Sequence, residues 1–347
     1  MNNQPSQAEL DYINFLVAEP SRISCTELSK LLTDEQTNGP AHDRFTQMLR
    51  DLDPSSDQLW REAAPLVGNG GLLILDDTTL DKPYSRKIEL VYRHWSGLHR
   101  RVVSGINLLT LFWTDGVRYI PCDYRIYDKA NDGLTKNDHF RAMLNTAKAR
   151  GLTPQLVSFD SWYSSLDNLK CLRELGWHWL TRLKSNRLVS TAPGVKGAVS
   201  DLSLTAAGTL VHLQGYGYIT VFRLVTTDGD IEHWATDWAA LDEGKLAVVG
   251  SHIWKIEQYH RALKQLCGVE RSQARRGDRQ RNHIGMSIRA FLRLEVARLR
   301  QGRSWYESKR EIIREALRAY LHTPLYNLTI NQLLVDAKLL STTDHDA

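Results

Sequence analysis

The chain has 347 residues, of which 42% are hydrophobic and 24% are charged, and its formal net charge is +4. This composition is ordinary for a soluble globular protein, and the length suggests two or three domains. The four cysteines lie far apart without a CxxC pair, which argues against a zinc site or a disulfide framework. The longest apolar stretch, INLLTLFW, is far too short to span a bilayer, and MNNQPSQAEL lacks the pattern of a signal peptide. We therefore expect a cytoplasmic protein.

Residues 1–69 are predicted to form a helical DNA-binding region. The pattern predicts helices over about 7–18, 25–33, 41–51 and 56–66. Ser24 is placed as the cap of the second helix. Two short helices around a turn are the arrangement of a helix-turn-helix DNA-binding motif, and a small packing bundle is the alternative interpretation.

From residue 70 the pattern becomes that of an α/β core, which is predicted to extend to 187. GLLILDD (71–77) is an apolar run bounded by glycine, as expected for a strand that is buried on both faces. Further strands are predicted over 101–113, 117–127, 154–160 and 177–185, and helices over 137–151 and 165–176. This order predicts a mixed central sheet that begins as a meander and has helices on its faces.

Residues 188–230 are rich in Gly, Thr and Val and are predicted to be a β-rich insertion. The core is predicted to resume over 231–268, with a strand (231–237) and a helix (about 244–267). Residues 269–347 are predicted to be a basic helical region, with helices over about 278–301, 304–321 and 329–339. Between His260 and Arg303, twelve Arg or Lys residues stand against three acidic ones, a local excess of nine positive charges. This excess suits a phosphate backbone, and a solvated basic tail is the alternative.

Aspartates follow two of the predicted strands where each strand meets a polar loop. Asp76 and Asp77 end the strand 71–77, and Asp160 ends the strand 154–160. If these strands are neighbours, their aspartates converge at one edge of the sheet. Converging carboxylates repel one another unless a cation neutralises them, and ligand sets made only of oxygen favour Mg²⁺ or Mn²⁺.

The helix predicted over 244–267 contributes further polar groups. Glu257, His260, Arg261 and Lys264 are spaced i, i+3, i+4 and i+7, which places them on one side of the helix, and a solvated charged face is the alternative interpretation. The aspartates also have alternative interpretations. Asp76 and Asp77 face opposite sides of their strand, and Asp160 has the position of an N-cap for a helix beginning near Ser164.

Three segments carry a resemblance to a known family: DDTT (76–79), SFDSWYSS (158–165) and IWKIEQYHRALKQ (253–265). Together they resemble the DDE transposases of bacterial insertion sequences, in the group with a β-rich insertion between the second aspartate and the glutamate. The similarity spans roughly residues 72–299, and the W-x-I-E-x-Y-H-R-x-L-K string is its specific part. The resemblance implies an α/β, ribonuclease-H-like mixed sheet with flanking helices. It also implies Asp77, in preference to Asp76, with Asp160 and Glu257 as catalytic ligands of two Mg²⁺ (or Mn²⁺) ions.

The resemblance also implies a set of DNA-contacting residues. Lys264 matches the family lysine that contacts DNA phosphate near the active site, and Lys82 matches a backbone-phosphate contact. The expected DNA-binding set is completed by His260, Arg261, Arg275 and Arg276. The family tyrosine and arginine upstream of the glutamate are replaced here by Gly250 and Ile253. This departure leaves the processing of the second DNA strand open.

The function implied is that of a DNA transposase in the nucleoid of a bacterial cytoplasm. It would bind terminal inverted repeats in double-stranded DNA as a homodimer, cleave there by two-metal phosphoryl transfer and join the 3′-hydroxyl ends to target DNA. One alternative is a ribonuclease-H-like nuclease or resolvase that cuts without joining. Others are a catalytically inactive, transposase-derived DNA-binding protein and a helical scaffold that does not meet DNA.

Overall fold

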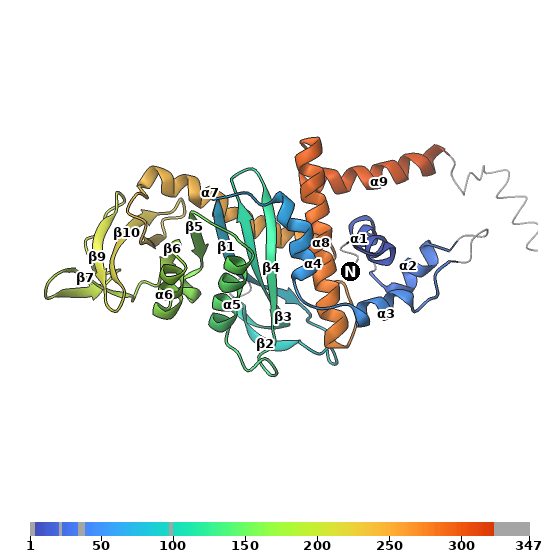
Figure 1. Cartoon of the computed structure of the whole chain (residues 1–347), viewed down its shortest axis with the longest axis horizontal. Coiled ribbons are helices and arrows are strands. Elements are labelled where there is room, and N and C mark those ends of the chain that lie inside the picture. Colours follow the sequence, from blue (N-terminus) through green and yellow to red (C-terminus); the bar gives the residue numbers. More distant parts are fainter. Residues whose placement is uncertain (1–3, 21–22, 34–38, 97–99, 323–347) are drawn as a thin grey trace, which may run out of the picture.

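The computed structural model describes residues 4–20, 23–33, 39–96 and 100–322. In this part of the chain a long mixed sheet has helices on both faces (Figure 1). The N-terminal helices lie against the long helix α8, at the opposite end of the molecule from the strands of the insertion (Figure 1).

The helices lie close to their predicted positions. Their bounds are α1 (Gln7–Ala18), α2 (Cys25–Leu31), α3 (Arg44–Asp51), α4 (Asp57–Ala63), α5 (Lys136–Ala149), α6 (Leu166–Glu174), α7 (Glu243–Leu266), α8 (Gly277–Gln301) and α9 (Trp305–His322), with 3₁₀ turns η1 (Ala64–Leu66) and η2 (Ser161–Tyr163). Ser24 caps α2 as predicted, because its side chain accepts a hydrogen bond from the backbone N–H of Glu27. The helix predicted over 329–339 lies outside the described residues.

The strands include one that the sequence pattern did not reveal, β2. Their bounds are β1 (Leu72–Asp81), β2 (Tyr92–Ser96), β3 (Arg101–Thr114), β4 (Tyr119–Tyr127), β5 (Leu156–Phe159), β6 (His178–Leu183), β7 (Leu188–Ala192), β8 (Val195–Ala198), β9 (Thr209–Leu213), β10 (Gly217–Val225) and β11 (Ile231–Thr236). All of them join one sheet in the order β2-β3-β1-β5-β6-β11-β10-β9-β7-β8, with β4 also paired to β3. The β-rich insertion therefore extends the core sheet through β11.

The middle of the sheet explains how the acidic residues are brought together. β1 pairs antiparallel with β3 and parallel with β5, so the carboxyl ends of β1 and β5 lie at the same edge. The condition stated from the sequence, that these two strands are neighbours in the sheet, is met. Among the residues that the structure describes, no helix has both the length and the hydrophobicity needed to cross a membrane.

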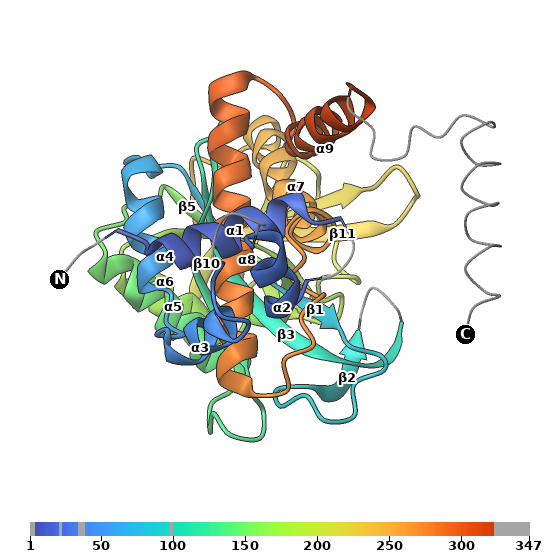
Figure 2. The ribbon, with the colours of Figure 1, turned by 90° about the vertical axis from the view of Figure 1, so that its right-hand side faces the viewer.

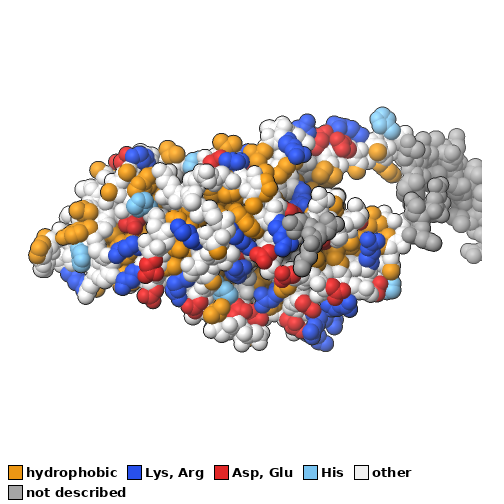
Figure 3. All heavy atoms as spheres, in the orientation of Figure 1, with side chains coloured by type: hydrophobic (Ala, Val, Ile, Leu, Met, Phe, Trp, Pro, Cys, Tyr) orange, Lys and Arg blue, Asp and Glu red, His pale blue; other side chains and the backbone are white. Residues whose placement is uncertain are grey.

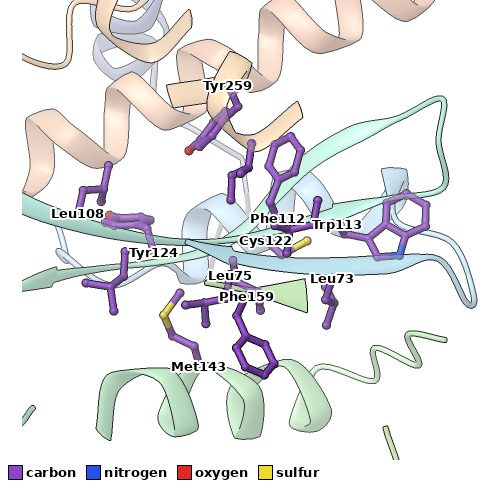
Figure 4. Packing of buried hydrophobic residues seen from close by; sticks show 14 of the residues in the cluster. Leu73, Leu75, Leu108, Phe112, Trp113, Cys122, Tyr124, Met143, Phe159 and Tyr259 are labelled. Atoms are coloured by element: carbon purple, nitrogen blue, oxygen red, sulfur yellow. The ribbon is translucent and has the colours of Figure 1, made fainter. Parts of the chain in front are cut away.

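The two faces of the sheet are covered by different helices, and the core residues show which is which. Phe112 of β3 packs on Tyr259 of α7, with ring centroids 4.9 Å apart, whereas Leu75 and Phe159 point toward Met143 of α5 (Figure 4). Alternate residues of β1 therefore face α7 and α5. This alternation determines which aspartate meets Glu257.

The N-terminal helices share a buried interface with α8. The Tyr12 hydroxyl lies 2.9 Å from His283 Nδ1, and Arg289 donates to Glu9 at 2.7 Å and to Glu62 at 2.6 Å. In Figure 2, α1 crosses in front of α8. Part of the basic excess predicted for 260–303 is thus neutralised inside the protein, by acids that α1 and α4 supply.

Candidate active site

The register of β1 places Asp76 on the face covered by α7. Asp76 is the partner of Thr110 in β3, two residues from the pair Ile74 and Phe112. Because Phe112 contacts α7, residues 74 and 76 share that face. Asp77 is paired with Leu109 and faces α5 instead.

Asp76 lies in a strongly negative environment. Burial raises the pKa of its carboxyl group well above the ordinary value, and the negative charges of Asp77, Glu257 and Asp160 raise it further. The nearest cation-forming side chain is His260, whose Nδ1 lies 3.8 Å from the Asp76 carboxylate. Burial lowers the pKa of His260 to about 3, so this imidazole is neutral and supplies no compensating charge. Asp76 is therefore a carboxylate that a metal cation would stabilise.

Asp77 lies in a different environment from that of Asp76. Its carboxylate accepts hydrogen bonds from Lys136 Nζ (2.8 Å), Asn107 Nδ2 (2.8 Å) and the Tyr163 hydroxyl (2.6 Å). Burial opposes its ionisation, but Lys136 and the other donors outweigh burial and hold the pKa below its ordinary value. Asp77 thus faces α5 and is neutralised by Lys136, whereas Asp76 faces α7, so these contacts favour Asp76 over the expected Asp77 as a metal ligand.

Asp160 directly follows β5, and extending the β1–β5 register by one residue places it beside Asp76. One of its carboxylate oxygens accepts a hydrogen bond from the backbone N–H of Ser161 at 2.7 Å and lies 3.4 Å from Arg182. Asp160 thus caps the short turn η2. The longer helix α6 is capped by Ser165, which excludes the alternative that Asp160 caps it.

Glu257 lies on the exposed side of α7, while Ile256, Tyr259 and Leu263 are buried. These buried residues form an apolar stripe along the helix. The predicted polar stripe holds only in part, because His260 is buried and Arg261 is exposed. Glu257 is close enough to Asp76 to raise the pKa of Asp76.

The acidic side chains suit a divalent ion in their chemistry, but they are not arranged as a finished site. Within residues 4–20, 23–33, 39–96 and 100–322, no three His, Cys, Asp or Glu side chains are grouped closely enough to hold a metal ion. The contacts of Asp160 with Ser161 and Arg182 both use the same carboxylate oxygen, Oδ1. Carboxylate oxygens are the ligands preferred by Mg²⁺ and Mn²⁺, and an ion would relieve the repulsion acting on Asp76.

Three residues that are predicted to contact DNA are instead buried or hydrogen-bonded within the protein. Lys82 is buried, and its ammonium donates to the carbonyl oxygens of Glu270 (2.6 Å) and Ser272 (2.7 Å). Lys264 donates to the Thr79 carbonyl at 2.6 Å and lies 3.3 Å from the Glu270 carboxylate. His260 is buried. The burial of Lys82 and His260 argues against the phosphate contacts that are expected of them.

The other predicted DNA-binding residues, Arg261, Arg275 and Arg276, are exposed, and their contact with DNA stays a prediction. Basic and acidic side chains are interspersed over the face shown in Figure 3.

Three polar residues near the site were not identified from the sequence: Lys136, Tyr163 and Arg182. Lys136 begins α5 outside the quoted motifs, whereas Tyr163 lies within SFDSWYSS, three residues after Asp160, and was not singled out there. Arg182 lies near the carboxyl end of β6, which is paired in parallel with β5, and it joins Glu232 (2.8 Å) to Asp160 (3.4 Å). Its place beside the strand that leads to Asp160 is the signal that could have revealed it.

Comparison with known proteins adds two findings. Residues 3–196, more than half of the chain, match a family model described as DDE superfamily endonuclease. The fold is similar to that of piggyBac transposase, solved by electron cryo-microscopy as a synaptic complex with hairpin DNA, with a TM-score of 0.50 and 11% sequence identity. That alignment covers 93% of this chain and 74% of the transposase chain. No curated protein matches the chain. The family match includes Asp76 and Asp160 and ends before Glu257.

Proposed function

Because the chain belongs to the DDE superfamily of endonucleases, we propose that it is a metal-dependent DNA transposase. It would bind the terminal inverted repeats of a transposable element of the insertion-sequence kind, cleave the DNA there and join the freed 3′-hydroxyl ends to target DNA. Asp76, Asp160 and Glu257 are assigned as the ligands of the catalytic ions. The environment of Asp76 supports this assignment most directly, since it is largely buried and subject to the charges of the other two carboxylates.

The residues around these ligands have supporting roles in the proposal. Mg²⁺ or Mn²⁺ ions, two per site, would activate the attacking oxygen and stabilise the leaving oxygen in phosphoryl transfer. Lys136, Tyr163 and Asn107 hold Asp77, and thereby fix the backbone of β1 next to Asp76. Arg182 holds Asp160 until an ion draws this carboxylate toward Asp76.

The partners and the cellular location are part of the same proposal. The similar transposase was solved in complex with hairpin DNA, and the exposed Arg261, Arg275 and Arg276 are suited to phosphate contacts. Cleavage of two transposon ends in one complex requires two active sites, so a homodimer on double-stranded DNA is proposed. A protein of this kind would work at the bacterial nucleoid.

Cleavage of supercoiled plasmid DNA in the presence of Mn²⁺ tests the catalytic part of the proposal. The wild type should nick or linearise the plasmid, and EDTA should abolish this activity. Asp76→Asn and Asp160→Ala should reduce cleavage to background, whereas Asp77→Asn should keep Mn²⁺-dependent cleavage at a lower level. If the wild type binds DNA but does not cleave it above background with any metal ion, the protein would instead be an inactive DNA-binding protein.

A second assay separates a transposase from a nuclease. Duplex oligonucleotides with random ends and free 3′-hydroxyl groups are incubated with the protein, Mn²⁺ and a target plasmid, and insertions are then sequenced. A transposase should insert a recurring end sequence. A nuclease or resolvase should cut the plasmid and yield no insertions.

A further inference from the structure

The carboxyl end of β1 is tied to the end of α7 by charged side chains that face the protein interior. These are Lys82, Lys264 and Glu270, which we call the β1–α7 junction together with the backbone atoms that they bind. β1 carries Asp76 and α7 carries Glu257, so the junction connects the two elements that supply these carboxylates.

The hydrogen bonds of the junction run in both directions between the two segments. From α7, Lys264 donates to the carbonyl of Thr79. In the turn that follows α7, the Glu270 carboxylate accepts from the backbone N–H of Asp81 at 2.9 Å. From the end of β1, Lys82 donates to the carbonyls of Glu270 and Ser272. Thr79 is three residues from Asp76, and Lys264 is two helical turns from Glu257. A displacement at the junction is thus transmitted to both carboxylates over a short length of regular backbone.

Burial distinguishes this arrangement from a phosphate-binding site. Lys82 is 5% exposed, and only one-fifth of the Lys264 side chain is accessible. Both ammonium groups already have protein acceptors at 2.6–2.7 Å, so neither offers a free cation to DNA. A buried charge has to be fully hydrogen-bonded, which makes such a junction rigid.

We propose that Lys82, with Glu270 and Lys264, is a positioning group that sets the spacing of Asp76 and Glu257 for a shared metal ion, and that Lys82 does not bind DNA. This inference rests on the proposed function for its link to catalysis.

The test compares Lys82→Met with Lys309→Met in the full-length protein. Lys309 is a matched control because it is also buried and donates to a backbone carbonyl, that of Leu266 at the end of α7, at 2.9 Å. It comes from α9, and among the described residues it has no hydrogen bond to β1. Single-turnover cleavage of plasmid DNA at saturating DNA should fall roughly ten- to a hundredfold in Lys82→Met, and half-saturation by Mn²⁺ should shift upward. Lys309→Met should keep both within about twofold of the wild type. Glu270→Gln, which keeps the acceptor for Asp81 but loses the charge, should lie between the two.

DNA affinity and hydrogen exchange supply readouts that do not depend on cleavage. With Ca²⁺ in place of Mn²⁺, Lys82→Met should bind duplex DNA as the wild type does, with an unchanged salt dependence. Loss of one phosphate contact would lower the slope of log K against log salt by about 0.9 and would overturn the proposal. The amide of Asp81 should exchange faster in Lys82→Met than in Lys309→Met.

The two proposals fail in different ways. Absence of metal-dependent cleavage by the wild type would contradict the proposed function, and hydrogen exchange alone would then decide whether the junction connects β1 to α7. Normal cleavage and normal Mn²⁺ dependence in Lys82→Met would contradict the positioning role of Lys82. The proposed function would be unaffected by that result.

Discussion

Removing the charge of Asp76 and of Asp77 should have opposite effects on the stability of the metal-free protein. The pKa of Asp76 is raised, so its ionised form destabilises the fold at any pH above the unfolded value of about 4. Asp76→Asn removes an uncompensated, largely buried charge, a kind of group that typically costs roughly 1–3 kcal/mol, so it should increase the free energy of unfolding in EDTA by an amount of that order. The gain should vanish as the pH falls toward 4.

Asp77→Asn should destabilise the protein. This change removes the partner of Lys136, whose side chain is only one-fifth exposed, and disrupts the acceptor shared with Asn107. A lost hydrogen bond to a charged group costs roughly 1.5–3 kcal/mol, and an uncompensated, largely buried ammonium adds to this. We expect a loss of about 2–4 kcal/mol.

Urea denaturation at pH 7, with and without Mn²⁺, measures both effects. Mn²⁺ at a hundred times its dissociation constant should stabilise the wild type by about 2.7 kcal/mol. Asp77→Asn should keep this metal-induced gain, and Asp76→Asn should lose most of it. Equal destabilisation by the two changes, or loss of the gain in Asp77→Asn alone, would refute the assignment of Asp76.

The remaining predictions concern the helical interface and the basic surface. The pKa of His283 is lowered to about 3, chiefly by burial, so the wild type should lose up to about 1.4 kcal/mol per pH unit as the pH falls from 6.5 toward 3, and His283→Gln should reduce that slope in urea titrations. Arg289→Met leaves Glu9 and Glu62 without their shared cation and should cost roughly 3–5 kcal/mol by urea denaturation, whereas Arg50→Met, at an exposed pair, should cost less than about 1 kcal/mol. Changing Arg275 and Arg276 together to Gln should weaken binding to all duplex sequences alike and lower the salt slope by about two, and an unchanged slope would exclude both from phosphate contact.

Much of the architecture follows from local sequence signals. The apolar run before Asp76 and the order of the later strands and helices predicted the mixed sheet, and the sequence pattern located the helices to within a few positions. β2 was missed because YRHWS (92–96) is short and largely polar, and its strand character arises from pairing with β3. Its existence depends on tertiary context, which a single sequence does not show.

The candidate site was predictable as a group of carboxylates but not in its atomic detail. The choice between Asp76 and Asp77 depends on which face of β1 α7 covers, and no local pattern contains that information. Lys136, which neutralises Asp77, lies 59 residues away in the sequence. Likewise, the sequence suggests that Lys82 and Lys264 bind phosphate. Only the structure shows that their ammonium groups donate to backbone carbonyl groups of the protein itself.

The central claim is that Asp76, Asp160 and Glu257 share divalent ions at the edge of the sheet. The most direct measurement is a crystal structure of the protein soaked in Mn²⁺, with the ions located by anomalous scattering. We expect Mn²⁺ bound by Asp76 together with Asp160 or Glu257, the Asp160 carboxylate turned away from Arg182, and Asp77 still paired with Lys136. Mn²⁺ bound by Asp77, or bound elsewhere without Asp76, would contradict this account.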